Sequence, residues 1–466
     1  MACLLQSCKQ CVGCVLSVCR LYYHIFHSTY GPADDHLQFD MLKDYIEQLN
    51  TQLKSPVADQ PAEDNFVVCR ELDVSQSSRF IVAICTPLMK RVHRAVKHSA
   101  ELVFVDASGN MDRYNARVFL LLTHSSAGGL PLGVLILPNE QTTTIIAALQ
   151  LYSTLLDAEC FGGRGQQGPV VFMTDDSTAE RNALHTVFPD AQLLLCAFHV
   201  LQAFWRFLWD HKSGIAKEHR QYLFSFLKGM VYAQTEAKLE SEFSKAMEDS
   251  CVQRHVNVHS HLQQLFSRRQ EWAQCCRSDL PVRGNNANNF CESAMRVVKD
   301  EILQRTKAFN LQQLVDFMTT RFDSHYQRRL LDVANGRFTA SRFYSKSTCI
   351  DLQSIKQIES DLFEVSSEKS TDTKYVVDMS VGRCTCPKGN TGGPCKHQAA
   401  VVQNFNRHSW NFLPVNDPDM RKLFYFVATG DKTAPSDWFK AAESCDHSAI
   451  RRLVSSCAVC SAARGQ

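Results

Sequence analysis

The stretch VVFMTDDSTAERNALHTVFPDAQLLLCAFHV, residues 170–200, decides the fold. It opens with an unbroken apolar run, which is typical of a strand buried on both faces. Ser177 then begins a helix, and Glu180 three residues later gives the pattern of a capping box. Residues 191–196, AQLLLC, form a second apolar strand that runs into another helix. This alternation of strands and helices predicts an α/β fold.

Three further strands precede this stretch. The segments ELVFVDASGN, ARVFLLLTHSS and LPLGVLILPN occupy residues 101–110, 116–126 and 130–139. Gly128 and Gly129 mark a hairpin between the last two segments. A helix is expected over 140–159, before the deciding stretch begins. Hairpins followed by alternating strands and helices predict a mixed sheet within the α/β class.

Carboxylates stand at the ends of these strands. Asp106 ends the first strand, Asp175 and Asp176 end the fourth, and Glu292 begins a later amphipathic helix. Taken singly, each acid is better explained as a turn former or a helix cap. Strand ends lie at one edge of such a sheet, however, so the acids are expected to converge. Carboxylates bind Mg²⁺, and two such ions about 3.5–4 Å apart can activate water against a phosphodiester.

A second cluster lies in CTCPKGNTGGPCKH, residues 384–397. A closed structural zinc site takes four thiolate or imidazole ligands in a tetrahedron, and Cys384, Cys386, Cys395 and His397 supply four. The intervening Pro- and Gly-rich loop bends easily, so the two pairs can meet at one ion. A small unit of this kind folds because metal binding supplies the free energy. We therefore expect structural Zn²⁺ here.

The motifs together resemble a known family. Residues about 80–300 resemble a Mutator-like transposase domain of the RNase H-like fold, on FVDASGNMDRY, the deciding stretch and NNFCESAMRVVK. By position, Asp106, Asp175 and Glu292 match the three catalytic acids of that family, with Asp176 as a substitute for Asp175. Cys196 and His199 match its C-x-x-H. These two are not included in the zinc set, because two ligands do not make a structural zinc site.

The C-x-C and C-x-H pairs resemble the SWIM zinc finger, with which this family often ends. The resemblance implies a DNA- or protein-binding module. The chain departs from the transposase pattern at Ala107, Ser108 and Gly109, where the family usually keeps a Thr and an aromatic residue, and at Met295, where it often carries a polar residue. Because the acids are kept while their surroundings differ, the sequence favours a core that is not an enzyme.

Composition sets outer limits. The chain has 466 residues, 20 cysteines and a formal net charge of +2, so any contact with nucleic acid must be local. The scattered cysteines fit a reducing compartment, and no apolar run is long enough for a transmembrane helix. Two more Cys-rich groups have no assigned role: Cys3, Cys8, Cys11, Cys14 and Cys19 near the start, and Cys445, His447, Cys457 and Cys460 near the end. The first fits a poorly ordered leader best.

The sequence predicts six segments. They are a Cys-rich leader (1–30), a mainly helical region (31–97), the RNase H-like domain (98–300) with a helical insertion at about 215–275, a helical region (301–365), the SWIM finger (374–405) and a helical tail (406–466).

The expected protein is a zinc-binding, transposase-derived factor that contacts DNA or a nuclear protein partner, with neither a membrane span nor an evident small-molecule substrate. The resemblance implies a nuclear location; otherwise the protein is expected in the cytoplasm, and it is not expected to be secreted. Two alternatives stay open: an active two-metal nuclease or strand-transferase of the DDE type, for which Mg²⁺ would be needed, and an interaction scaffold without nucleic acid.

Overall fold

The computed structural model describes ten stretches of the chain. They are residues 35–54, 65–72, 79–109, 111–112, 115–306, 309–337, 350–368, 373–405, 407–414 and 417–440. The Cys-rich leader and the group Cys445, His447, Cys457 and Cys460 lie outside them, so both stay predictions.

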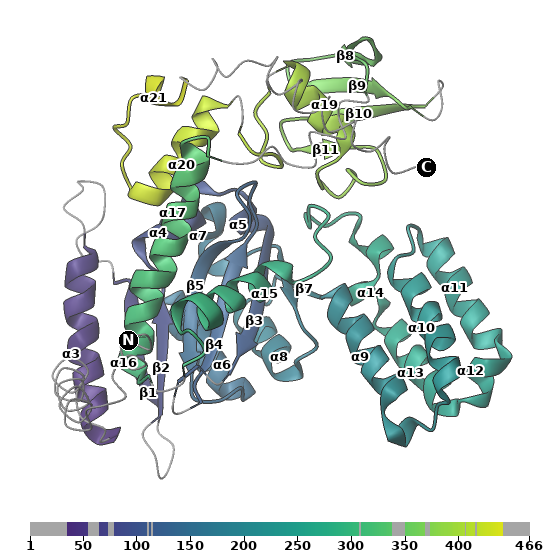
Figure 1. Ribbon diagram of the computed structural model, residues 1–466, viewed down its shortest axis with the longest axis horizontal. Coiled ribbons are helices and arrows are strands. Elements are labelled where there is room, and N and C mark those ends of the chain that lie inside the picture. Colours follow the sequence, from purple (N-terminus) through teal and green to yellow (C-terminus); the bar gives the residue numbers. More distant parts are fainter. Residues whose placement is uncertain are drawn as a thin grey trace, which may run out of the picture.

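A mixed sheet lies at the centre of the molecule (Figure 1). It has seven strands in the order β1-β2-β5-β4-β3-β6-β7. The strands are β1 (Val67–Leu72), β2 (Arg79–Ile84), β3 (Leu102–Ser108), β4 (Arg117–Thr123), β5 (Leu130–Leu137), β6 (Val171–Thr174) and β7 (Gln192–Leu195). Neighbours from β1 to β3 pair antiparallel, whereas β3, β6 and β7 run parallel. The predicted α/β class with a mixed sheet is confirmed.

Helices cover this sheet. The helices that come before residue 190 in the chain are α3 (Asp35–Leu53), α4 (Pro87–Ala95), α5 (His98–Glu101), α6 (Thr142–Ser153), α7 (Cys160–Gly163) and α8 (Thr178–Val187). Those that come after residue 288 are α15 (Asn289–Arg296), α16 (Leu311–Phe317), α17 (Asp323–Ala334), α20 (Pro418–Thr429) and α21 (Asp437–Lys440). Helices α17 and α20 pack side by side (Figure 1). The buried side chains of these helices and of the sheet form one continuous apolar core.

Two strands of the sheet, β1 and β2, are not predicted by the sequence. The segment predicted to be mainly helical contains α3 and α4, but it also supplies β1 and β2. These strands form a hairpin that reaches the rest of the sheet through β5. Strand β1 is an edge strand, and its charged residues, such as Arg70, remain exposed. Its short, partly polar sequence therefore lacks the apolar run that identified the inner strands.

A separate bundle of helices interrupts the domain between β7 and α15, and we call residues 197–286 the helical insertion (Figure 1). Its helices are α9 (Ala197–Trp209), α10 (Lys217–Val231), α11 (Glu236–Glu248), α12 (Ser250–Arg254), α13 (Val256–Ser267) and α14 (Arg269–Trp272). They enclose an apolar core of their own. Because α9 already belongs to this core, the bundle begins earlier than the predicted residue 215.

The two ends of the helical insertion meet. The amide of Ala197 donates to the carbonyl of Asn286 at 2.8 Å. The guanidinium of Arg277, 1% exposed, donates to the carbonyl of Leu195 at 2.5 Å and to the side chain of Asn286 at 3.0 Å. Hydrogen bonds thus close the helical insertion at the point where it leaves the sheet.

A second, antiparallel sheet of order β11-β10-β9-β8 lies in residues 350–405, which we call the finger module. Its elements are β8 (Ile355–Gln357), β9 (Leu362–Ser366), β10 (Lys374–Asp378), β11 (Arg383–Cys384) and α19 (Lys396–Phe405). The expectation of helix up to residue 365 is wrong for β8 and β9. Strand β9 pairs with β10, and β8 pairs with β9. Because this pairing stabilises the short strands, the pattern of residues within each strand does not predict them.

Candidate functional site

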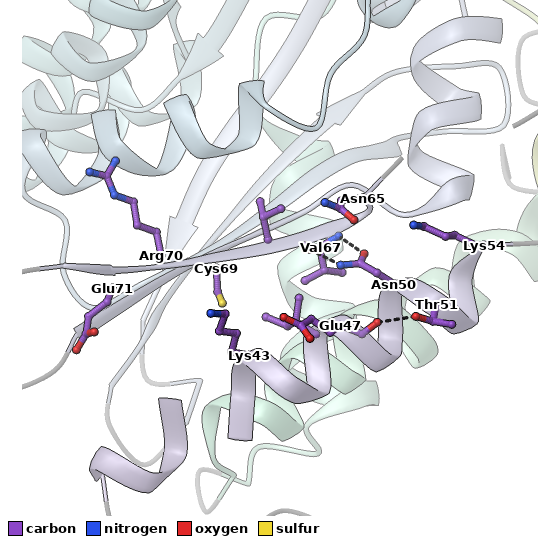
Figure 2. A pocket seen from close by; sticks show the side chains of 12 residues that line it. Lys43, Glu47, Asn50, Thr51, Lys54, Asn65, Val67, Cys69, Arg70 and Glu71 are labelled. Atoms are coloured by element: carbon purple, nitrogen blue, oxygen red, sulfur yellow. Dashed lines mark hydrogen bonds between the residues drawn. The ribbon is translucent and has the colours of Figure 1, made fainter. Parts of the chain in front are cut away.

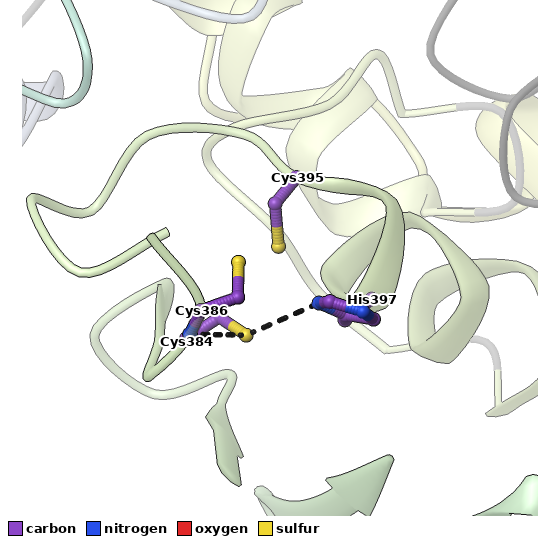
Figure 3. Close-up of side chains that lie close together, drawn as sticks. All are labelled: Cys384, Cys386, Cys395 and His397. Carbon is purple, nitrogen blue, oxygen red and sulfur yellow. Dashed lines mark hydrogen bonds between the residues drawn. The ribbon is translucent and has the colours of Figure 1, made fainter. Parts of the chain in front are cut away.

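The finger module brings the four predicted zinc ligands together. Figure 3 shows the side chains of Cys384, Cys386, Cys395 and His397 pointing toward one another. All four residues are buried, and their ligand atoms all lie within 4.8 Å of one another. Cys384 Sγ lies 3.6 Å from His397 Nδ1, which matches the edge of about 3.6 Å expected for a zinc tetrahedron with one sulfur and one nitrogen. The donor set therefore fits Zn²⁺.

Surrounding groups hold these ligands in place. A backbone amide faces each sulfur: that of Cys386 faces Cys384 at 3.5 Å, that of Gly389 faces Cys386 at 3.3 Å, and that of Gln398 faces Cys395 at 3.5 Å. The ring of Tyr375 stacks on His397 with centroids 4.6 Å apart. Such outer contacts orient metal ligands and stabilise thiolate charge.

Arg283 joins the finger module to the sheet domain. Its guanidinium makes a two-pronged ion pair with Glu101 at 2.6 and 2.8 Å, and both side chains are almost buried. The same guanidinium donates to the carbonyl of Val381 at 2.5 Å, and its backbone amide donates to Thr391 at 3.0 Å. The zinc-binding loop is thereby fixed against α5, immediately before the strand that carries Asp106.

The first two acids face one another on neighbouring strands. In the parallel pair β3 and β6, Phe104 lies opposite Met173. Continuing that register by two residues places Asp106 opposite Asp175. Asp175 also accepts a hydrogen bond from the amide of Ser177 at 3.0 Å, at the start of α8. The predicted meeting of these two strand ends follows directly from the sheet order.

The third acid reaches this edge on α15. The side chain of Asn288 donates to the carbonyl of Val105 at 2.8 Å, next to Asp106, and so fixes the start of the helix. Phe290 packs edge-on against Phe104 with centroids 5.2 Å apart. Glu292, one turn along, lies with Oε1 3.6 Å from Nε2 of His199.

Electrostatics tie these groups into one cluster. Burial raises the pKa of Asp106 to about 6; the charges of Asp175 and Glu292 add to the rise, and His199 opposes it. Hydrogen bonding to Cys196 raises the pKa of His199, and the charges of Asp106 and Asp175 contribute. The three acids therefore act on one another, although their oxygens do not form a group within 4.8 Å among the residues described.

Cys196 and His199 lie beside these acids. Burial alone would raise the pKa of the Cys196 thiol, but hydrogen bonds to His199 lower it overall. Its sulfur also accepts from the amide of Asn288 at 3.2 Å. The pair consequently connects the start of α9 to the start of α15 and presents the imidazole to Glu292.

Two nearby carboxylates have other surroundings. Asp176 pairs with Arg268 of the helical insertion at 2.7 Å, whereas the charge of Asp175 acts on Asp106. Ser177 caps α8 through the amide of Glu180, as the sequence predicted. The Glu180 side chain does not complete a capping box; it is 2% exposed, and its Oε1 has no hydrogen-bond partner. Burial raises the pKa of Glu180 well above its usual value.

A polar hollow lies between α3 and β1 (Figure 2). The amide side chain of Asn50 lies within it and pairs with the backbone of Phe66 and Val67. Three strands separate β1 from β3 in the sheet order. The hollow is therefore remote from the acids, and its one buried amide already has partners within the chain.

Two further groups of metal-ligand side chains were not predicted from the sequence. His219, Cys251 and His255 meet in the helical insertion, and His98, Glu101 and His124 meet under the finger module. Only the C-x-x-x-H spacing of Cys251 and His255, one helical turn apart, was available in the sequence as a signal.

Two parts of the chain resemble known protein families. The MULE transposase domain family matches residues 102–203, which include Asp106, Asp175, Cys196 and His199. The SWIM zinc finger family matches residues 375–406, which include all four zinc ligands. A search of curated proteins found no significant match. None of the helices described is both long and apolar enough to cross a membrane. The chain therefore carries a match to the MULE transposase domain and a match to the SWIM zinc finger, a combination that supports a SWIM-domain protein derived from a Mutator-like transposase.

Proposed function

We propose that the protein is a nuclear binding factor that contacts DNA or a protein partner through its finger module, on a core that does not catalyse. The observation that carries the proposal is the zinc cluster together with its attachment through Arg283. A finger held rigidly on a large domain presents a fixed surface, which lowers the entropic cost of binding a partner.

The surface of the finger module favours a protein partner. Four large apolar side chains are exposed there: Leu352, Ile358, Val376 and Val381. Lys374 pairs with Glu364 at 2.7 Å and Lys396 with Glu368 at 2.5 Å, so part of the positive charge is already neutralised within the module. Affinity for DNA rises with the number of phosphates that a protein neutralises. These pairings therefore weaken the case for DNA at this surface.

The core supports a second candidate function, a two-metal nuclease or strand-transferase. Strands β5-β4-β3-β6-β7 have the order and directions that we take as RNase H-like, and Asp106 and Asp175 lie opposite one another at its centre. Carboxylates placed in this way can hold Mg²⁺ and direct water onto a phosphodiester. An exposed row of aromatic side chains, Phe198, Trp205 and Trp209, leads away from the acids along α9. Bases stack on such side chains.

One experiment separates these functions. Purified wild-type protein is incubated with labelled DNA and Mg²⁺ or Mn²⁺, beside Asp106→Asn, Glu292→Gln and Cys395→Ser. Binding and cleavage are measured in the same samples. The proposal predicts no cleavage by any of the four proteins, and any binding to DNA is lost only in Cys395→Ser.

Metal-dependent cleavage that disappears in both acid variants would establish the nuclease and overturn the proposal. Absence of both binding and cleavage, with the exposed apolar side chains required for capture of a defined protein partner, would assign the finger module to protein alone.

A further inference from the structure

Two histidines and a cysteine converge in the helical insertion, far from the SWIM cluster. His219 lies in the first turn of α10, Cys251 lies in α12, and His255 caps the end of α12. Their ligand atoms all lie within 4.8 Å of one another. Cys251 is 6% exposed, whereas the two imidazoles are half-buried. The group therefore has one sulfur facing the apolar core and two nitrogens nearer to solvent.

Hydrogen bonds between α10 and the start of α12 bring the three side chains together. Asp249 caps α12 by accepting from the amides of Cys251 and Val252 at 2.9 and 3.1 Å. Its other oxygen accepts from the hydroxyl of Tyr222 on α10 at 2.7 Å. This bridge sets α12 against the first turns of α10, and residues four apart on a helix share one face, so Cys251 and His255 both turn toward His219.

The distances suit a shared ion better than a hydrogen bond. Nδ1 of His219 lies 3.4 Å from Nε2 of His255, which is longer than the usual range of about 2.7–3.2 Å for hydrogen bonds donated by nitrogen. Two nitrogens bound to one tetrahedral zinc ion are about 3.3 Å apart. The two rings are inclined at 64°, so their planes intersect, which is a requirement for two such imidazoles to bind one ion in their ring planes.

We propose that His219, Cys251 and His255 form a second metal site, which takes Zn²⁺ or a similar borderline-soft divalent ion. Imidazole and thiolate are the donors that such ions prefer. Three protein ligands leave the fourth tetrahedral position to water or to an incoming ligand, as in open zinc sites. The ion ties α10 to α12, and binding releases the proton of the Cys251 thiol.

The other group of ligand side chains does not meet the same geometric test. The rings of His98 and His124 are stacked, with centroids 4.1 Å apart and planes only 14° from parallel. Two parallel rings cannot both hold one ion in their planes. Glu101, the third member, is already paired at both oxygens with Arg283, whose positive charge opposes a cation there.

The test is a count of metal per chain on the full-length protein. Purified protein is dialysed against ZnCl₂, freed of unbound metal and analysed by mass spectrometry for zinc. Wild type is expected to hold at least two ions, one in each of these clusters of the described residues. Cys251→Ser and His255→Gln are each expected to hold one ion fewer than wild type. The matched control is His259→Gln, one turn further along α13 and outside the cluster, which should keep the wild-type count.

Cobalt supplies an independent readout. Protein loaded with Co²⁺ should lose part of its visible d–d absorption and sulfur charge-transfer band in His219→Gln, while circular dichroism shows an intact helical fold. One zinc ion per wild-type chain, removed by Cys395→Ser, would overturn the proposal. So would a zinc count in Cys251→Ser that equals the wild-type count. If Cys251→Ser does not fold, the wild-type count and His219→Gln still decide.

Discussion

Asp106 sits in surroundings that disfavour its charge. Its pKa of about 6 in the folded chain lies above the ordinary value of 3.8, mainly because the carboxyl is buried. The stability contributed by this group is therefore fully present below about pH 3.8 and is lost as the pH rises through 6. Asp106→Asn should stabilise the protein by about 2–3 kcal/mol at pH 7, because it removes the buried charge.

Urea denaturation without added Mg²⁺ checks this prediction at pH 7 and at pH 4. The gain over wild type should vanish at pH 4, where Asp106 is already protonated. The charge at this residue would not be the cause if the gain were the same at both pH values.

Buried histidines give the opposite dependence on pH. Burial lowers the pKa of His93 to about 3 and that of His98 to about 4, whereas the ordinary value is 6.5. In the unfolded chain both residues take up protons below pH 6.5, but in the folded chain they do not. Each should therefore cost about 2 kcal/mol of stability between pH 7 and pH 5.

Comparing His93→Gln with wild type by denaturation at both pH values isolates one of these contributions. The loss of stability on acidification should shrink in this variant and should be unchanged in His185→Gln, whose imidazole is exposed. Equal losses in all three proteins would contradict the assignment.

Among the elements, the loop that carries Arg283 connects two bodies. Removing one partner of a buried ion pair leaves the other charge uncompensated and typically costs about 3–5 kcal/mol. Arg283→Met should destabilise the protein on that scale and free the finger module from the sheet domain. Adding Glu101→Gln should restore part of the loss. Denaturation, together with limited proteolysis around residue 381, measures both effects.

A surface pair provides the control for this prediction. Lys238 and Glu242 lie 2.7 Å apart on α11, and the lysine is more than half exposed. Lys238→Met should change stability by less than about 1 kcal/mol. A similar loss in both variants would mean that Arg283 has no special role.

The finger module should depend on its metal. Its apolar cluster is small and includes the zinc-ligating cysteines themselves. Because metal binding supplies folding free energy in such units, a strong chelator should expose residues 350–405 to protease while the seven-stranded sheet keeps its amide protection. Hydrogen exchange followed by mass spectrometry would record both regions at once. Protection of β9 and β10 that survives chelation would contradict this dependence.

Some of these elements can be predicted from the sequence, and others cannot. Strands β3 to β7 were recognised because they are long or unbroken apolar runs, and their acids were found because parallel strand ends share an edge. Strands β1, β8 and β9 are short and partly polar, and they exist through pairing with distant partners. The group of His219, Cys251 and His255 was missed for the same reason, since α10 and α12 meet only through tertiary packing. Chemistry carried on one short loop, such as residues 384–397, was readable directly.

At the scale of the whole molecule, the described residues form three packed units: the sheet domain, the helical insertion and the finger module. The sheet domain and the helical insertion have separate apolar cores, and Arg283 and its neighbours attach the finger module. The acids lie close to the two ends of the helical insertion, where it leaves the sheet and returns to it. The helical insertion contacts this edge of the sheet through Arg268, which pairs with Asp176, and through His199, which faces Glu292.

The closed root of the helical insertion has a consequence for how such a chain can change over generations. Ala197 and Asn286 are hydrogen-bonded to each other. The helical insertion therefore leaves the sheet and returns to it at nearly the same place, as a tight loop would. Arg277, which lies inside the bundle, also bonds Leu195 and Asn286, so the sheet should tolerate changes of length between α10 and α13 as long as Arg277 and the start of α9 are kept. A shortened bundle that keeps these residues should still fold onto the sheet with Glu292 on the side of Asp106.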